Sequence, residues 1–218
     1  MTVLDMFKRC VNIGKDYQHT EINKGSYFIE YDDDTLYIYF QGSNGDIDWK
    51  NNFDFGVEPY RDMPIEWKAH KGFSRVWKEI EPFVREAIMN PNVKKIVIVG
   101  YSHGAALAVL AHEYVWFNRP DIRDNIFGYG FEPPRVFRGK KIPEELASRW
   151  EQFYVFRNGE DLVTHVPPRF LGYKHIGNLV HLNEDRKILV DESFKLKCIN
   201  EHNSPNVIAS LEAEGFDE

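Results

Sequence analysis

Residues 100–104 place a serine in a setting that suits nucleophilic catalysis. They read G-Y-S-H-G, with Ser102 at the centre and a glycine two positions away on each side. A serine raised above a sheet on a strained turn needs glycine there, because Cβ atoms would collide with neighbouring backbone. The pattern therefore predicts that Ser102 is a nucleophile. An ordinary small-residue turn between a strand and a helix is the alternative interpretation.

The flanking residues predict the elements that would position this serine. Residues 96–100 form an apolar, β-branched run that ends in glycine, which is typical of a buried parallel strand. Residues 105–115 are rich in alanine and leucine and predict a helix. That helix would begin beneath Ser102, with its positive end near a developing oxyanion. We expect His103 to contribute its backbone N–H to the oxyanion, while its ring points away.

A serine hydroxyl needs a general base, and the base needs a carboxylate to orient it. In folds with this turn, the carboxylate and the histidine follow the serine in that order. Asp161 comes just after a predicted strand at 152–157 and is the candidate carboxylate. His202 is the first choice of base, because it directly precedes the predicted last helix in a polar stretch that suits an exposed, mobile base.

Other histidines also follow Asp161. His175 and His181 remain alternative bases, although His181 falls within a predicted strand and is expected to be a packed side chain. His165 lies too close to Asp161 along the chain to be the first choice. Position along the chain alone does not decide between His202 and the two alternatives.

A glycine-rich loop at 41–49 follows a predicted aromatic strand at 35–40. In such folds the second oxyanion donor comes from a loop ahead of the nucleophile strand. The backbone N–H of Ser43 is the candidate donor, with its hydroxyl as a second candidate. A plain flexible loop is the alternative interpretation of these residues alone.

The segment 44–71 is loop-like yet aromatic, and it predicts a lid or the lining of a pocket. The candidate substrate-binding side chains in this segment and beside the nucleophile are Trp49, Phe53, Phe55, Trp67 and Tyr101. Seven charged residues alternate with the aromatic ones between Asp46 and Asp62. A wide apolar opening would place those charges beside lipid, so we expect little interfacial activation.

Length and element order predict one α/β domain spanning 1–218. With 218 residues, 43% of them hydrophobic, the chain can form one substantial core but not two. Strands that alternate with helices predict a mostly parallel sheet with helices on both faces. The further predicted strands lie at 27–31, 125–131, 179–182 and 187–190, and the further helices within 1–25 and at 72–90, 143–150 and 205–213.

Charge and composition restrict partners and location. A net charge of −7 without a basic cluster disfavours nucleic acid, and no apolar stretch is long enough for stable membrane insertion. Charged residues interrupt the N-terminal region where a signal peptide needs an apolar core, so we expect a cytoplasmic protein. Cys10 and Cys198 are expected to be free buried thiols, a disulfide being the alternative. The oligomeric state is left open.

Together these motifs resemble the class 3 lipase family, the α/β-hydrolases typified by fungal triacylglycerol lipases. The family's early motifs are matched by FQGS at 40–43, DW at 48–49, HKGF at 70–73 and GYSHGAALA at 100–108. Its later motifs are matched by GFEPPRV at 130–136, NGEDLVTHVPP at 158–168, HIG at 175–177 and EH at 201–202. The motifs keep their order from Tyr27 to Leu211.

The resemblance implies an α/β-hydrolase fold and a carboxylic ester hydrolase that needs no cofactor or metal. It implies a triad of Ser102, Asp161 and His202, and gives His175 a structural role. Gln41 replaces the family's usual arginine, and Tyr101 replaces the histidine before the nucleophile. A lipid or small-molecule ester would be the substrate. A thioesterase, a small-ester esterase and a non-catalytic binding module remain alternatives.

Overall fold

The computed structural model describes residues 1–23, 25–42, 56–60, 67–140, 144–183 and 202–217. Its centre is a seven-stranded sheet with the order β1-β2-β3-β6-β7-β9-β11. Five neighbours run parallel, namely β3 (Thr35–Phe40), β6 (Lys95–Tyr101), β7 (Ile126–Phe131), β9 (Phe153–Asn158) and β11 (Asn178–Leu182). The antiparallel edge consists of β1 (Gln18–His19) and β2 (Ser26–Asp32). The expected mostly parallel sheet is confirmed.

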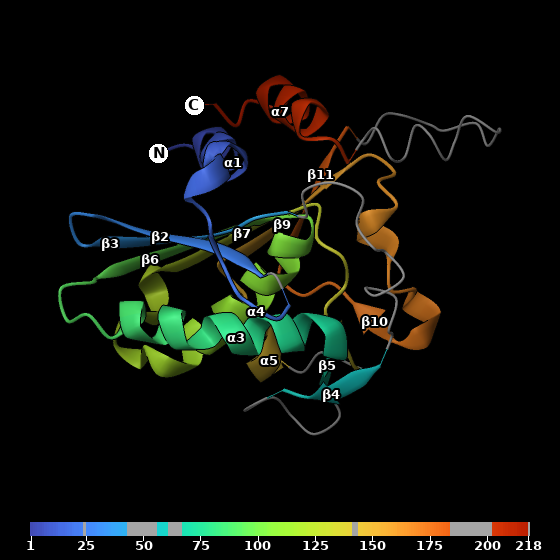
Figure 1. Cartoon of the computed structure of the whole chain (residues 1–218). Coiled ribbons are helices and arrows are strands. Elements are labelled where there is room, and N and C mark those ends of the chain that lie inside the picture. The colour runs from blue at the N-terminus through green and yellow to red at the C-terminus, as the bar shows by residue number, and fades with distance from the viewer. Residues whose placement is uncertain (24, 43–55, 61–66, 141–143, 184–201, 218) are drawn as a thin grey trace.

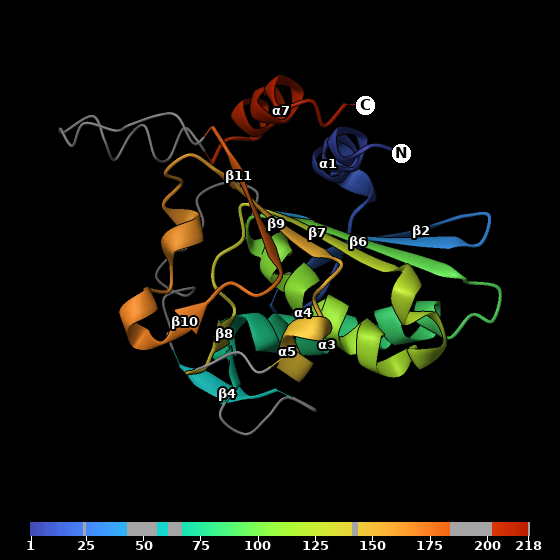
Figure 2. The same cartoon turned by 180° about the vertical axis from the view of Figure 1, so that it is seen from behind.

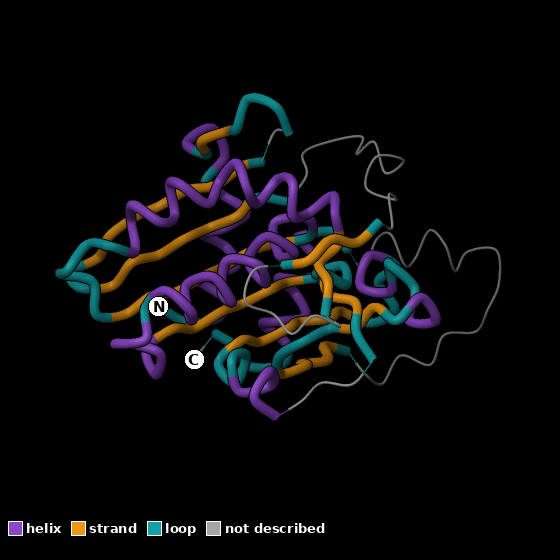
Figure 3. Tube along the Cα trace, turned by 90° about the horizontal axis from the view of Figure 1, so that it is seen from below, coloured by secondary structure: helices purple, strands orange, loops and turns teal. Residues whose placement is uncertain are grey.

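Helices cover both faces of this sheet (Figures 1 and 2). One face carries α1 (Val3–Asn12) and α7 (Ser204–Ala213), and the other carries α3 (Lys71–Ile88), α4 (His103–Asn118) and α5 (Glu144–Ser148). Alternation along β6 divides the core accordingly. Ile96 and Ile98 pack with α3 and α4, whereas Val97 and Val99 pack with α1 and α7. Seen from below, α3 and α4 lie along the strands (Figure 3).

The two chain ends lie side by side on the face that carries α1 and α7 (Figure 1). The Leu4 N–H donates to the Phe216 carbonyl at 3.2 Å, and the Lys8 ammonium pairs with Glu212 at 2.8 Å. This contact holds α7, the helix that follows His202, against the N-terminal helix. None of the described helices is both long and apolar enough to span a membrane.

Short 3₁₀ helices connect the larger elements. They are η1 (Gly14–Asp16), η2 (Pro120–Asn125), η3 (Val163–His165) and η4 (Arg169–Leu171). The sequence did not predict them, because three-residue turns carry no clear periodicity. The predicted strand at 187–190 lies outside the described residues.

A second, four-stranded antiparallel sheet was not expected from the sequence. Its order is β10 (Tyr173–Lys174), β8 (Phe137–Arg138), β5 (Lys68–His70) and β4 (Val57–Pro59). Two of its strands come from the segment predicted as a lid or pocket lining. The described residues 56–60 of that segment are fastened to the core, since the Tyr60 hydroxyl donates to the Leu110 carbonyl at 2.9 Å and the Ser74 hydroxyl to Glu58 at 2.5 Å.

Trp67 was predicted to bind substrate, but its side chain is part of the core. It is 1% exposed, and its indole lies so close to Gly139 that a Cβ atom there would collide with it. In this conformation Trp67 therefore supports the second sheet and does not face an open pocket. Cys10 is free and buried, as expected, and Cys198 lies outside the described residues.

Candidate active site

Ser102 lies on a strained turn between β6 and α4. Its backbone has φ 55° and ψ −124°, a left-handed region that non-glycine residues seldom adopt. A Cβ atom on Gly100 would collide with Gly104, and one on Gly104 would collide with the Phe40 carbonyl. The steric reason predicted for the two glycines is therefore confirmed. The Ser102 N–H donates to the Phe131 carbonyl at 2.8 Å, which fixes the turn against β7.

The structure brings Ser102, His202 and Asp161 together, although they are far apart in sequence. His202 Nε2 lies 2.8 Å from Ser102 Oγ, and His202 Nδ1 lies 2.7 Å from Asp161 Oδ2. Both Ser102 and Asp161 follow the carboxyl ends of parallel strands, β6 and β9, which meet at one edge of the sheet. His202 lies just before α7, whose contact with α1 holds it above that edge. Chemically, the arrangement is that of an activated serine nucleophile.

Asp161 is fully buried, and it accepts the last hydrogen bond in the chain Ser102–His202–Asp161. Burial by itself would raise the pKa of Asp161. The interaction with the neighbouring Glu132 and the hydrogen bonds from His202 and from the Val163 N–H outweigh burial and hold the pKa below its usual value. Asp161 can therefore remain ionised and orient the imidazole of His202.

Tyr101, predicted to bind substrate, lies against the candidate base. Its ring stacks on His202 with centroids 5.3 Å apart, and its hydroxyl donates to the His202 carbonyl. The ring also makes a T-shaped contact with Phe7, with centroids 5.4 Å apart. These contacts give Tyr101 a direct part in holding His202 in place.

The other candidate histidines lie away from the serine. His175 Nε2 lies 2.8 Å from the Thr164 carbonyl, and burial lowers the pKa of His175 to about 3. His165 Nε2 lies 3.0 Å from the Arg157 guanidinium. His181 is exposed on β11, so the expectation of a packed side chain is wrong. β11 lies at the end of the sheet, and strand periodicity alone does not reveal which face of such a strand is covered.

Of the two predicted oxyanion donors, His103 lies within the described residues and Ser43 lies outside them. His103 is the first residue of α4, so its backbone N–H has no acceptor within the helix. Its ring meets Phe73 edge-on at 5.4 Å, and burial lowers the pKa of the ring to about 4. Gly42 lies directly beside the nucleophile, since a Cβ atom there would be 3.3 Å from Ser102 Cβ. The loop that leads to Ser43 thus starts next to the serine.

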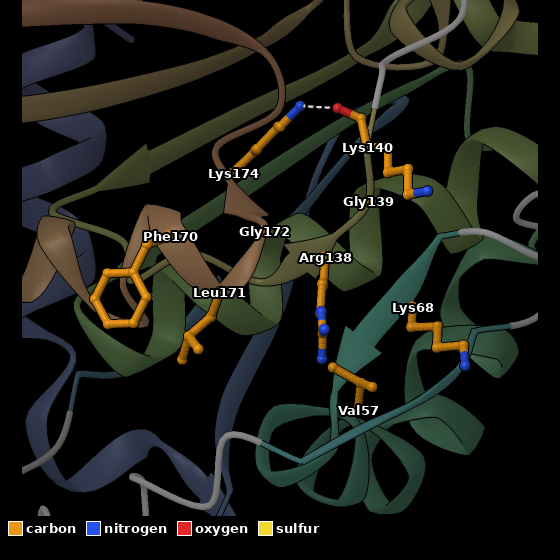
Figure 4. A pocket seen from close by; sticks show the side chains of 9 residues that line it. All are labelled: Val57, Lys68, Arg138, Gly139, Lys140, Phe170, Leu171, Gly172 and Lys174. Atoms are coloured by element: carbon orange, nitrogen blue, oxygen red, sulfur yellow. Dashed lines mark hydrogen bonds between the residues drawn. The ribbon is translucent and has the colours of Figure 1, made fainter.

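The predicted pocket residues Trp49, Phe53 and Phe55 also lie outside the described residues. Among the described residues, a cavity of about 780 Å³ lies over the four-stranded sheet (Figure 4). Its lining combines four cationic side chains with apolar ones and comprises Val57, Lys68, Arg138, Gly139, Lys140, Phe170, Leu171, Gly172 and Lys174. It includes no member of the Ser102–His202–Asp161 group, so we do not regard it as the acyl site.

The sequence did not indicate Glu132, which lies beside Asp161 in the structure. One carboxylate oxygen of Glu132, one of Asp161 and one ring nitrogen of His202 all lie within 4.8 Å of one another. Glu132 directly follows β7, the neighbour of β9 in the sheet. The signal in the sequence that could have pointed to Glu132 was a carboxylic acid directly after a central parallel strand.

Comparison with known proteins identifies the family of this chain. The model of the family Lipase (class 3) matches residues 37–171. The chain belongs to the lipase class 3 family. Secreted mono- and diacylglycerol lipase 1 of Fusarium solani is 27% identical over 148 residues, which are 64% of this chain and 41% of that protein. Secreted mono- and diacylglycerol lipase LIP2 of Malassezia restricta is 32% identical over 121 residues, or 53% of this chain and 38% of that protein.

Solved structures of lipases share the fold of this family member. A triacylglycerol lipase with a serine protease triad at its catalytic centre superposes with a TM-score of 0.65 at 23% identity, covering 77% of this chain and 65% of that one. A triacylglycerol lipase from Penicillium expansum gives a TM-score of 0.68 at 17% identity, covering 82% and 78%. The expected α/β-hydrolase fold is confirmed. The chain spans about two fifths of the length of the curated relatives it matches.

The expectation of a cytoplasmic protein is contradicted by these relatives. The lipases of Fusarium solani and Malassezia restricta are named as secreted enzymes. The charged residues in the first helix were no sound basis for that expectation, because α1 is an integral part of the fold. Its Leu4 and Phe7 are buried against the central sheet.

Proposed function

We propose that this lipase class 3 protein hydrolyses carboxylic esters of acyl chains through an acyl-serine intermediate. The observation that carries the proposal is the position of His202. Its Nε2 lies 2.8 Å from Ser102 Oγ, and its Nδ1 lies 2.7 Å from Asp161 Oδ2. A binding module has no need of this arrangement. Because Asp161 accepts a hydrogen bond from Nδ1–H, the Nδ1 proton stays on the ring and Nε2 is free to take the proton of the serine.

In the proposed reaction, Ser102 Oγ attacks the ester carbonyl while His202 Nε2 takes its proton. The tetrahedral oxyanion would be held by the His103 N–H and by the Ser43 N–H, each contributing about 3 kcal/mol. Protonated His202 then gives its proton to the departing alcohol, which leaves the acyl group on Ser102. In the second half, His202 deprotonates water, which attacks the acyl-serine carbonyl. The acyl–Oγ bond then breaks, protonated His202 returns its proton to Ser102 Oγ, and the acid leaves.

For the substrate we propose acylglycerol-type esters presented as single molecules. Relatives of the chain are named as mono- and diacylglycerol lipases. The alternation of charged and aromatic residues between Asp46 and Asp62 argues against a wide apolar opening onto an oil phase. We therefore expect medium-chain monomeric esters to be hydrolysed faster than emulsified long-chain triglyceride.

Hydrolysis rates across p-nitrophenyl esters of increasing chain length, with matched thioesters, test this proposal. We expect turnover that peaks at medium chain length, and faster cleavage of oxygen esters than of thioesters. Preferential cleavage of thioesters would instead make the protein a thioesterase. A sharp rise in rate when tributyrin exceeds its solubility limit would contradict the proposed preference for single molecules. No turnover of any ester by the folded protein would favour the binding module.

A further inference from the structure

Glu132 is a buried carboxylic acid in an unusual backbone conformation. It is 0% exposed and has a φ of 54°, the left-handed region that favours glycine. Its N–H donates to the Phe156 carbonyl at 2.9 Å, and its Oε1 accepts the Asn158 N–H at 2.5 Å. These bonds hold the side chain between the ends of β7 and β9. A buried acid kept on strained backbone at this place points to a specific role for the side chain.

The side chain of Glu132 lies beside the carboxylate of Asp161, with one oxygen of each within 4.8 Å of the other. Among the described residues, Glu132 Oε2 has no N–H or O–H donor. Asp161 already accepts the Val163 N–H at 2.9 Å and His202 Nδ1–H at 2.7 Å. Two ionised carboxylates this close and this deeply buried would repel each other strongly. One proton shared between them removes the repulsion and gives the buried Oε2 a partner.

The charged and titratable groups around Glu132 come from several elements. Tyr101 approaches from β6, Arg157 from β9, and Asp161 and His202 from the loops after β9 and before α7. The Arg157 guanidinium donates to Thr164 at 3.1 Å and to His165 at 3.0 Å, so its hydrogen bonds within the described part of the chain go to partners other than the two acids. The negative charge of a second ionised carboxylate would be poorly compensated.

We propose that Glu132 is a protonated acid in the resting protein and donates a hydrogen bond to Asp161. This bond would extend the hydrogen-bonded series to Glu132–Asp161–His202–Ser102. Burial and the contact with Asp161 raise the pKa of Glu132 well above its usual value, outweighing the Asn158 N–H and the charge of Arg157. The same hydrogen bond helps to keep Asp161 ionised.

Glu132 would be a positioning residue, and its effect on catalysis rests on the proposed ester hydrolysis. Its hydrogen bond fixes one Asp161 oxygen, which leaves the other directed at His202 Nδ1. Ionisation of Glu132 at high pH would place a second negative charge beside Asp161 and disturb that alignment. We therefore expect the wild-type activity to fall at alkaline pH as Glu132 loses its proton.

Two substitutions distinguish the effect of the Glu132 proton from the effect of the whole side chain. Glu132→Gln supplies an N–H donor to Asp161 at every pH and keeps an oxygen for the Asn158 N–H. Glu132→Gly removes the side chain and is compatible with the left-handed backbone. We expect Glu132→Gln to keep most of kcat and to lose the alkaline decline, and Glu132→Gly to lower kcat about tenfold at unchanged KM. Equal kinetic losses in both variants, or an alkaline decline unchanged in Glu132→Gln, would contradict the proposed role of the proton.

Infrared spectroscopy of the folded protein in D2O at pH 8 tests the proton directly, without any need for activity. Ordinary carboxyl groups are ionised at this pH, so a protonated carboxyl C=O band should stand alone. We expect this band in wild type and in Ser102→Ala, and its loss in Glu132→Gln. Absence of the band from wild type, or its persistence in Glu132→Gln, would overturn the proposal. A band with the expected behaviour in a protein without ester turnover would support the shared proton and refute the proposed function alone.

Discussion

The ring of Tyr101 stacks on the imidazole of His202, with 5.3 Å between centroids and 21° between planes. The Tyr101 hydroxyl also donates to the His202 carbonyl. Tyr101 directly precedes the nucleophile, so this contact joins the turn that carries Ser102 to the loop that carries the base. The side chain of Tyr101, which is next to Ser102 in sequence, contacts both the ring and the backbone carbonyl of His202. It therefore helps to position the nucleophile and the base relative to each other.

Removing parts of Tyr101 should lower kcat. Tyr101→Phe keeps the stacked ring and loses one hydrogen bond, so we expect about a threefold loss in kcat. Tyr101→Ala loses both contacts, and we expect a loss of about thirtyfold. Steady-state kinetics on a medium-chain p-nitrophenyl ester measure both. A rise in KM that grows with acyl chain length, at unchanged kcat, would show that Tyr101 binds substrate instead.

Replacing the histidines one at a time should distinguish the base from its alternatives. We expect His202→Ala to lose at least about 10³-fold in kcat, with the double variant with Ser102→Ala little worse, because the residues act as one unit. His175→Ala removes the contact with Thr164 and should lower the melting temperature while most turnover per folded molecule remains. An inactive, folded His175→Ala would contradict the assignment of His202.

The raised pKa of Glu132 should appear in the pH dependence of stability. Above the usual glutamate pKa the unfolded chain releases this proton while the native protein retains it, so wild-type stability falls as pH rises toward the native pKa. Glu132→Gln lacks this term. Its free energy of unfolding relative to wild type should therefore rise with pH, by up to about 1.4 kcal/mol per pH unit. Urea denaturation of both proteins between pH 5 and pH 8, roughly the range of maximal stability for most proteins, measures the difference.

Asp161 should act in the opposite direction at low pH. Its native pKa is lowered, so its contribution to stability is present above the usual aspartate pKa and is lost as pH falls through the native value.

For Glu132, the contradicting outcome is a difference in unfolding free energy between Glu132→Gln and wild type that stays constant between about pH 5 and pH 8. That result would show that Glu132 titrates normally.

The buried ion pair between Arg149 and Glu113 should matter more than its exposed neighbour. Arg149 pairs with Glu113 at 2.9 Å, where Glu113 is 0% exposed. Glu113→Ala leaves a buried guanidinium without this partner and should cost about 3 kcal/mol of unfolding free energy. Glu145→Ala is the matched control, because Glu145 lies 3.7 Å from the same arginine but is 87% exposed; its cost should stay below about 1 kcal/mol. Equal effects would contradict this account.

The sequence predicted the central sheet because its signals are local. The apolar run at 96–100 and the glycines around Ser102 each describe their own backbone, and β6 and the turn formed where expected. The second sheet could not be predicted, because strands of two or three residues have no measurable periodicity and depend on distant partners. For the same reason Trp67 was assigned to a pocket although it is buried against Gly139.

Parts of the site depend on which residues meet in space. Chain order and family motifs suggested Ser102, Asp161 and His202, and these three lie together. Glu132 was missed because its importance depends on its neighbour Asp161, which lies in the loop after another strand, β9. Burial decides the properties of such groups, and burial follows from tertiary packing, which a single sequence does not display.

The central claim is that Ser102 is the nucleophile of an ester hydrolase, and labelling with a fluorophosphonate probe tests it most directly. His202 Nε2, 2.8 Å from Ser102 Oγ, should activate the hydroxyl for attack on phosphorus. We expect wild-type protein to be labelled on the peptide containing Ser102, and folded Ser102→Ala to be unlabelled and at least about 10³-fold less active. Labelling that persists in Ser102→Ala, or a wild-type protein that is not labelled, would contradict the claim.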